Sequence, residues 1–328
     1  MEQPPRADGR PVRECSVEQV NREHRHEDPL VRHDRAPVGP VAFSVPERLA
    51  TVDSTNRYLM DLALAGLPDG SEVPNGYGVV AERQSAGRGR LDRRWQSPLG
   101  ASVLCSILLR PDLVLERLHL APWAVALAAS RACSGTAGVE LWLKWPNDLV
   151  TGAVDAAADP DAAVACSDTE RKVAGILSEI LPPRVEARRD LSVQGIPAGI
   201  VVGIGINVNW PANWPPADST DPELVSIAAH ATSLNRIAGH EVDRNELTTR
   251  LLEETRLFTS MLASSEGCYV LASKYRLACA TIGREVRVEL AEETVAGLAL
   301  DLDDAGRLLV STGACIRTVS AGDVVHLR

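Results

Sequence analysis

Apolar positions follow two periods along this chain, and each period predicts one kind of element. Runs rich in Val, Ile and Leu predict strands at 77–84, 101–111, 139–150, 171–181 and 197–210. Leucines at helical spacing predict helices between the N-capping positions 53–55 and Gly66, over about 116–137, and over about 243–264. The order of these elements predicts an α+β fold, with a mixed β-sheet flanked by helices.

Pattern and composition divide the chain into three expected domains or segments. Residues 1–40 are rich in charge and proline and lack an apolar pattern, so a disordered tail is expected. Residues 41–279 supply the sheet and helices of one large domain. Residues 280–328 contain short alternating strands between Gly and Asp turns, which is typical of a small β-barrel. Within the large domain, the Ala/Asp-rich segment 151–170 is expected to be a mobile insertion between two hairpin strands.

Composition narrows the class of protein. The chain has 328 residues, 45% of them hydrophobic, and a formal net charge of −10, which argues against general affinity for nucleic acid or anionic lipid. No apolar run is long enough to span a membrane, and the first residues lack the apolar core of a secretory signal. The seven cysteines are scattered and without a C-x-x-C pair. We therefore expect a soluble cytoplasmic protein with free thiols.

One segment is strongly basic, although the chain as a whole carries a net negative charge. Residues 83–100, RQSAGRGRLDRRWQSPLG, contain five arginines. A solvated surface loop is the usual outcome for such a charge run. Alternatively, alternate glycines let backbone amides converge on phosphate oxygens, and arginine forks bind phosphate in a bidentate manner. Taken alone, the segment leaves both interpretations open.

Three further segments contain candidate site residues. KWPND at 144–148 follows a strand, where its polar side chains could enter a cleft or simply form a β-turn. Lys172 opens an apolar strand and Gly175 leaves room beside it for a flat ligand, although a strand-edge lysine is usually solvated. The glycines of GIGINVN, 203–209, weaken a strand unless another group approaches closely. Dinucleotide fingerprints, phosphate loops, nucleophile elbows and metal-ligand spacings are absent from the sequence.

Taken in order along the chain, these segments resemble the biotin protein ligases. The ordered set is DSTN (53–56), RQSAGRGRxxRxWxSPxG, KWPND, RKVAGIL (171–177) and GIGINVN, followed by GRxVRVxL and GDVxHLR near the C-terminus. The resemblance covers about residues 45–328. It implies a class II synthetase-like biotin/lipoate ligase catalytic domain and a C-terminal SH3-like barrel. It also implies that ATP and biotin, with Mg²⁺, form biotinyl-5′-AMP, from which biotin passes to a lysine on the biotin carboxyl carrier domain of an acyl-CoA carboxylase.

The same resemblance implies roles for individual residues. The catalytic set is Lys172, Arg88, Arg90 and Asp148. The biotin-binding set is Ser54, Thr55, Asn56, Gln84, Gly87, Arg88, Lys172, Gly175 and Gly203. The ATP and adenylate set is Arg88, Arg90, Trp95, Asn147, Lys172 and Asn207. The arginine-rich loop is expected to be mobile when empty and ordered when filled, and Asp148 to orient or deprotonate the acceptor lysine.

The chain departs from the repressor-type members of that family, because nothing before Val41 has the apolar pattern of a helix-turn-helix. A monofunctional ligase is therefore expected, monomeric or weakly dimeric, without nucleic-acid, membrane or resident metal partners. Three alternatives stay open: a lipoate-type ligase, a biotin-sensing regulator without catalysis, and an interaction module built around the barrel. The GRGR run and the barrel favour biotin over lipoate, and the full set of polar residues favours catalysis.

Overall fold

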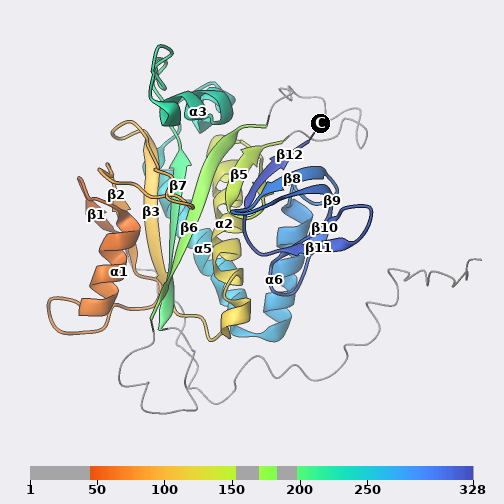
Figure 1. The fold of residues 1–328 in the computed structure, drawn as a ribbon. Helices are drawn as coiled ribbons and strands as arrows, with labels where there is room; N and C mark the ends of the chain where they lie inside the picture. The colour runs from red at the N-terminus through yellow and green to blue at the C-terminus, as the bar shows by residue number, and fades with distance from the viewer. Residues whose placement is uncertain (1–44, 153–169, 183–197, 328) are drawn as a thin grey trace, which may run out of the picture.

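A seven-stranded mixed sheet organises the larger part of the structure, a computed structural model that describes residues 45–152, 170–182 and 198–327 (Figure 1). Its strand order is β1-β2-β3-β7-β6-β5-β4, and every neighbouring pair is antiparallel except β1 and β2. The strands are β1 (Glu47–Leu49), β2 (Gly78–Ala81), β3 (Ser102–Leu109), β4 (Leu141–Lys144), β5 (Asp148–Thr151), β6 (Lys172–Leu181) and β7 (Gly199–Asn207). The expected tail and nearly all of the expected insertion lie outside the described residues.

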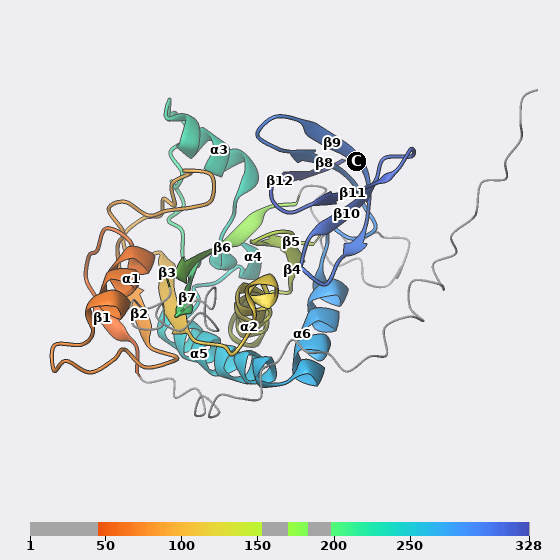
Figure 2. The ribbon, with the colours of Figure 1, turned by 60° about the horizontal axis from the view of Figure 1, so that its bottom comes forward.

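Helices cover both faces of this sheet. They are α1 (Thr55–Ala65), α2 (Leu120–Ala137), α3 (Pro222–His230), α4 (Leu234–Ala238), α5 (Arg244–Ser260) and α6 (Ser265–Ala278), with 3₁₀ turns η1 (Leu115–Arg117) and η4 (Met261–Ala263). Helix α2 lies between the sheet and the pair α5 and α6 (Figure 2). Because α2 is covered on both sides, 12 of its 18 residues are buried, which explains its nearly continuous Ala/Leu composition.

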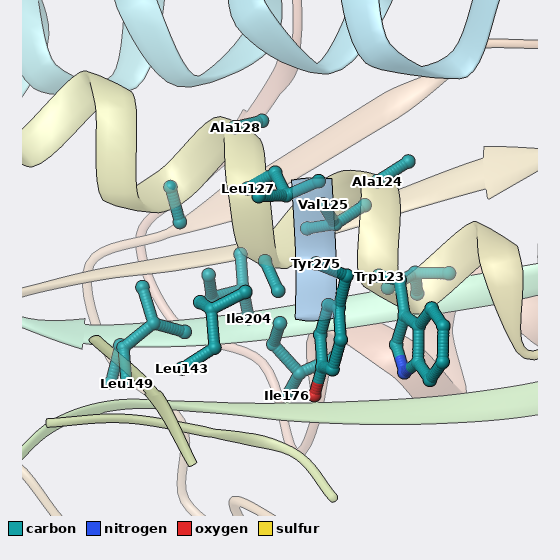
Figure 3. Close-up of a cluster of buried hydrophobic side chains, with 14 of the residues drawn as sticks. Trp123, Ala124, Val125, Leu127, Ala128, Leu143, Leu149, Ile176, Ile204 and Tyr275 are labelled. Atoms are coloured by element: carbon teal, nitrogen blue, oxygen red, sulfur yellow. The ribbon is translucent and has the colours of Figure 1, made fainter. Parts of the chain in front are cut away.

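The alternation of side chains along each strand assigns them to two separate cores. On the α2 face, Val125 and Leu127 pack with Leu143 and Ile204 of the sheet, and Tyr275 of α6 closes this core (Figure 3). On the opposite face, a smaller core joins α1 to the sheet through Leu59, Ala63, Val79, Leu108 and Val201. Each large aliphatic side chain buried in this way contributes about 1.5–3 kcal/mol.

A separate five-stranded antiparallel sheet follows α6, and it is the SH3-like unit expected from the sequence. Its order is β11-β10-β9-β8-β12. The strands are β8 (Glu285–Glu289), β9 (Thr294–Leu302), β10 (Leu308–Ser311), β11 (Ile316–Val319) and β12 (Asp323–His326). Strand β12 lies beside β5 of the larger sheet (Figure 1).

Most of the sequence-based elements agree with the structure, but α6 was not predicted, although its Cys268, Leu271 and Tyr275 are buried. The expected helix 243–264 begins as predicted, because the Asp243 carboxylate accepts hydrogen bonds from the backbone N–H groups of Asn245 and Glu246. It ends earlier, and a new helix, α6, begins after the Ser264 cap. The short helix α3 was not predicted, since none of its residues is buried. Within the described residues no helix is long and apolar enough to cross a membrane, and the five cysteines there are free.

Candidate functional site: a glycine-floored, arginine-lined cavity

A cavity opens on the α1 face of the sheet, at the N-terminal end of that helix. The residues that line it are Ser54, Thr55, Asn56, Gln84, Arg88, Gly89, Arg90, Arg93, Arg94, Trp95, Asn147, Asp148, Lys172, Gly175, Ile176, Leu177, Gly203, Ile204, Gly205 and Asp323. They come from α1, the arginine-rich loop, strands β5, β6 and β7, and strand β12 of the smaller sheet. All five sequence clusters of the large domain therefore contribute residues to this cavity, each with only part of its length.

The floor of the cavity is made by glycines at alternate positions of β7. Val201, two residues before Gly203 on the same face, is covered by α1. Gly203 lies against Asn56 in the first turn of that helix, and Gly205 lies against the Trp95 indole. A Cβ added at Gly203 would lie 2.8 Å from Asn56 Cγ, and one added at Gly205 would lie 2.9 Å from the indole nitrogen of Trp95. Glycine is therefore required here for close approach of other groups, as the strand pattern indicated.

Buried polar groups at one end of the cavity form a connected network. Gln84 Oε1 accepts hydrogen bonds from the backbone N–H and hydroxyl of Thr55, at 2.8 and 3.0 Å. The Asn56 amide nitrogen donates to Leu177 O and to Glu179 Oε2, both at 3.0 Å. Ser106 Oγ, on β3, lies 2.6 Å from Asn56 Oδ1 and completes the network. Since every amide and hydroxyl here is held by a partner, this end of the cavity is rigid and polar.

Lys172 reaches the cavity through an irregularity in β6. Gly175 lies opposite Asp148, but Lys172 lies opposite Val150, so β6 contains one extra residue in this stretch. In a regular strand, residues three apart point to opposite faces; the bulge brings Lys172 and Gly175 to the same face. Val173 and Ala174 are correspondingly both buried in the α2 core.

Lys172 forms an ion pair with Asp148, which was assigned from the sequence to the same catalytic set. Lys172 Nζ lies 2.6 Å from Asp148 Oδ1, with angles outside hydrogen-bond geometry. The two side chains are 34% and 25% exposed, so the pair faces the cavity rather than the core.

The arginine-rich loop is a tight hairpin. Trp95 N–H donates to Gly87 O at 3.0 Å, and Gly89 N–H donates to the carbonyl of Arg93 at 2.7 Å. The left-handed backbone conformations fall on Leu91 (φ 54°) and Asp92 (φ 58°), which is the pattern of a type I′ turn. The loop glycines were expected to supply unusual backbone angles, and this was wrong. Gly87 supplies space instead, because a Cβ there would lie 3.0 Å from Gln84 Nε2 and closer to the Trp95 carbonyl.

Four cations of the cavity are each held by a group of the protein. These pairs are Arg88 with Glu179 (2.9 Å), Arg90 with Asn147 Oδ1 (3.1 Å), Arg93 with Asp323, and Lys172 with Asp148. Burial lowers the pKa of Arg90 from 12.5, while the charge of Asp148 opposes that shift, so the guanidinium stays protonated at neutral pH. Such an arrangement suits an anionic ligand, which can replace the internal partners with its own oxygens.

Trp95 lies across the cavity, directly on the glycine floor. Lys172 Nζ is 5.8 Å from the centroid of the indole ring. The indole N–H is buried and has no hydrogen-bond partner within the described part of the chain. The flat space above the glycines is therefore filled by the Trp95 side chain, whose indole N–H can pair with a ligand.

Comparison with known proteins decides the family. A model of the Biotin/lipoate A/B protein ligase family matches residues 49–207, and a model of the Biotin protein ligase C terminal domain matches residues 281–327. A biotin--[acetyl-CoA-carboxylase] ligase of Mycobacterium tuberculosis is 33% identical over 287 residues, which cover 85% of this chain and 88% of that protein. The chain belongs to the biotin protein ligase family.

Other relatives agree with this assignment. The bifunctional ligase/repressor BirA of Bacillus subtilis is 30% identical to this ligase over 256 residues, 77% of this chain and 67% of that protein. The biotin protein ligase from Aquifex aeolicus in complex with biotin and ATP is structurally similar, with a TM-score of 0.62 at 26% identity. That likeness covers 87% of this chain and 100% of the Aquifex chain.

Two of the expected site residues do not line the cavity of this ligase. Gly87 is buried beneath the hairpin, beside Gln84. Asn207 is buried at the end of β7, where its amide nitrogen donates to Thr232 O at 3.0 Å. Its Oδ1 has no hydrogen-bond partner among the residues that the structure describes. Thr232 N–H in turn donates to the carbonyl of Lys172, so Asn207 supports the backbone at the start of β6.

Several lining residues within the quoted motifs were given no role from the sequence, among them Gly89, Arg93, Arg94 and Gly205. Three further residues of the site were also missed by sequence reasoning. Ser106 could have been found, because it is a polar residue in the middle of the apolar strand SVLCSILL. Glu179 carried no signal, since a glutamate at the end of a strand is usually solvated. Asp323 also carried none, because it comes from the other sheet and reaches the cavity only through the packing of the two domains.

Proposed function

We propose that this cavity joins biotin to AMP and then delivers the biotinyl group to a lysine on the biotin carboxyl carrier domain of an acyl-CoA carboxylase. The protein is an ATP-dependent biotin ligase. The observation that most supports the residue roles is that a glycine floor, an arginine hairpin and the Lys172–Asp148 pair face one cavity.

In the first half-reaction, a biotin carboxylate oxygen attacks the α-phosphorus of ATP. A carboxyl–phosphate anhydride bond forms, and the bond to pyrophosphate breaks. Each pair of like unit charges at 4 Å costs about 4 kcal/mol at an effective dielectric constant near 20. We assign Lys172, Arg88 and Arg90 to offset that repulsion, because all three already line the cavity as preorganised donors.

The polar network is assigned to the ureido end of biotin, with Thr55, Asn56 and Gln84 as its hydrogen-bonding groups. The bicyclic ring would lie along the glycine floor. Trp95 would leave that floor and cover the adenylate, which excludes water from a labile anhydride. Mg²⁺ is proposed to arrive as the ATP complex, because it prefers phosphate oxygens and its own water ligands.

The second half-reaction needs a neutral amine. An exposed lysine has a pKa near 10.4, so only about 0.04% of it is uncharged at pH 7. Asp148 would orient the incoming ammonium group and accept its proton, after which the amine attacks the biotinyl carbonyl and AMP leaves. The cavity would then regain its Lys172–Asp148 pair.

The location and assembly of the enzyme are also proposed. Free thiols at all five described cysteines support a cytoplasmic site of action. A monomer or weak homodimer is expected, which light scattering during gel filtration measures directly.

Transfer of biotin to a purified carrier domain, followed by mass spectrometry, tests this function. The mixture contains ATP, Mg²⁺ and either biotin or lipoate, and only biotin should be transferred. Lys172→Ala should slow pyrophosphate release by about 10²-fold or more, since a donor aimed at a developing anion is lost. Lys274→Ala, which removes an exposed lysine from α6, is the matched control. Transfer of lipoate alone, or a Lys172→Ala variant within threefold of the parent, would refute the proposal.

A further inference from the structure

Four side chains form a closed polar cluster where β12 meets the larger sheet. Glu170 lies between Lys144 Nζ (2.6 Å to Oε1) and His326 Nδ1 (2.7 Å to Oε2). On its other side, His326 Nε2 lies 3.1 Å from Thr281 Oγ1. The side chain of His326 is 7% exposed, so this cluster is an internal feature of the domain junction.

The negative charge of Glu170 is stabilised by the two groups beside it, Lys144 and His326. Burial by itself would raise the pKa of Glu170, but the hydrogen bond from His326 and the charge of Lys144 outweigh it and lower that pKa from 4.5 to about 2. Glu170 is therefore ionised at neutral pH and can only accept, so His326 Nδ1 must be the donor.

Every member of the cluster outside β12 is connected to a residue that lines the cavity. Lys144 ends β4 and lies directly opposite Asp148 in the β4–β5 pair. Glu170 precedes Lys172 by two residues along the chain. Thr281 Oγ1 accepts a hydrogen bond from the backbone N–H of Trp145, at 3.0 Å, in the turn that leads to Asn147.

Holding the two domains together does not by itself require these charges. Trp145 Nε1 donates to Gly306 O at 3.0 Å, and Arg276 donates to Leu302 O at 2.8 Å, so neutral acceptors already join the domains. A buried ion pair adds little net stability, because desolvation offsets its attraction, but it fixes the direction of its partners. The cluster therefore fixes the positions of the groups it connects more than it adds to the free energy of unfolding.

We infer that His326 is a positioning residue that, through Glu170, fixes the backbone carrying Lys172 and the start of β5, where Asp148 lies. The inference rests on the proposed function, since these two residues are assigned to the chemistry there. The five-stranded domain thereby sets the geometry of the Lys172–Asp148 pair, in addition to contributing Asp323 to the cavity wall. Displacing a reacting group by about 1 Å can reduce a rate by about 10²-fold.

Three substitutions at His326 test this inference in the full-length enzyme. His326→Asn keeps a donor at the position of Nδ1, His326→Gln keeps one at the position of Nε2, and His326→Ala keeps neither. We expect kcat for biotin-dependent pyrophosphate release to fall by 10- to 100-fold in the Ala and Gln variants. In the Asn variant it should stay within about threefold of the parent. KM for biotin should change by a smaller factor than kcat, since Thr55, Asn56 and Gln84, which are assigned to the ureido end, lie outside the cluster.

Arg276→Ala is the matched control, because it removes a domain contact that does not touch the cavity floor. It should lower the melting temperature and leave kcat unchanged. Equal kcat in the Asn and Gln variants, measured well below their melting temperatures, would overturn the inference, and this comparison holds even if the Ala variant does not fold. A parent enzyme that releases no pyrophosphate with biotin would instead refute the proposed function.

Discussion

Replacing Gly203 with alanine adds one methyl group at the most crowded point of the cavity floor. The new Cβ would lie 2.8 Å from Asn56 Cγ and closer still to its Oδ1. Asn56 cannot retreat freely, because it is 3% exposed and is held by Ser106, Leu177 and Glu179. Either the backbone of β7 shifts, or Asn56 moves and loses its hydrogen bonds.

Both routes cost free energy of unfolding. Overpacking of a filled core costs about 1–3 kcal/mol, and each buried polar group left without a partner costs about 1–3 kcal/mol. We expect the cheaper route to destabilise the enzyme by about 1–3 kcal/mol. For a domain of this size that corresponds to a melting temperature lower by roughly 3–10 °C. Biotin affinity should fall at least tenfold, because the polar network is displaced.

Calorimetry measures both quantities, by thermal unfolding and by biotin titration. Gly78→Ala is the matched control: Gly78 is also a buried strand glycine, but its added Cβ would meet Pro46 at an ordinary 3.4 Å. It should be within about 1 kcal/mol of the parent. The double variant Gly203→Ala/Asn56→Ala removes the clash, so its stability loss should be smaller than the sum of the two single losses. If Gly203→Ala melts like Gly78→Ala and binds biotin like the parent, the steric reasoning is refuted.

Three more outcomes are expected. The lowered pKa of Glu170 means that its contribution, about 3 kcal/mol, is complete above pH 4.5 and is lost as pH falls towards 2. In urea unfolding, Glu170→Gln should therefore differ most from the parent at pH 7, and the difference should shrink below pH 4.5 and disappear only as pH falls to about 2. Because the Trp95 indole lies on the glycine floor, adding biotin and ATP should change the tryptophan fluorescence of the parent, and Trp95→Phe should abolish most of that change. Arg90→Gly removes a buried cation and should weaken retention of biotinyl-adenylate. The released adenylate is detected as biotin labelling of an unrelated lysine-rich protein. Parent-like labelling, together with an unchanged adenylate off-rate, would contradict this role.

The sequence by itself determined the elements whose side chains repeat at a regular period. The Ala/Leu run over about 116–137 predicted a long helix, and the apolar runs at 171–181 and 197–210 predicted two buried strands. Its short polar segments, taken in order, predicted most of the cavity lining. Such features are local, since side-chain period, capping and strand glycines act within a few residues of each other.

Only the tertiary structure decided which of these groups meet and how they point. The bulge in β6 turns Lys172 towards the cavity, although its distance of three residues from Gly175 predicts opposite faces. Glu179 and Asp323 enter the site because strands and domains far apart in sequence pack together. Register, bulges and domain contacts depend on how whole faces are buried against one another, and that information is spread over the entire chain rather than held in any one segment.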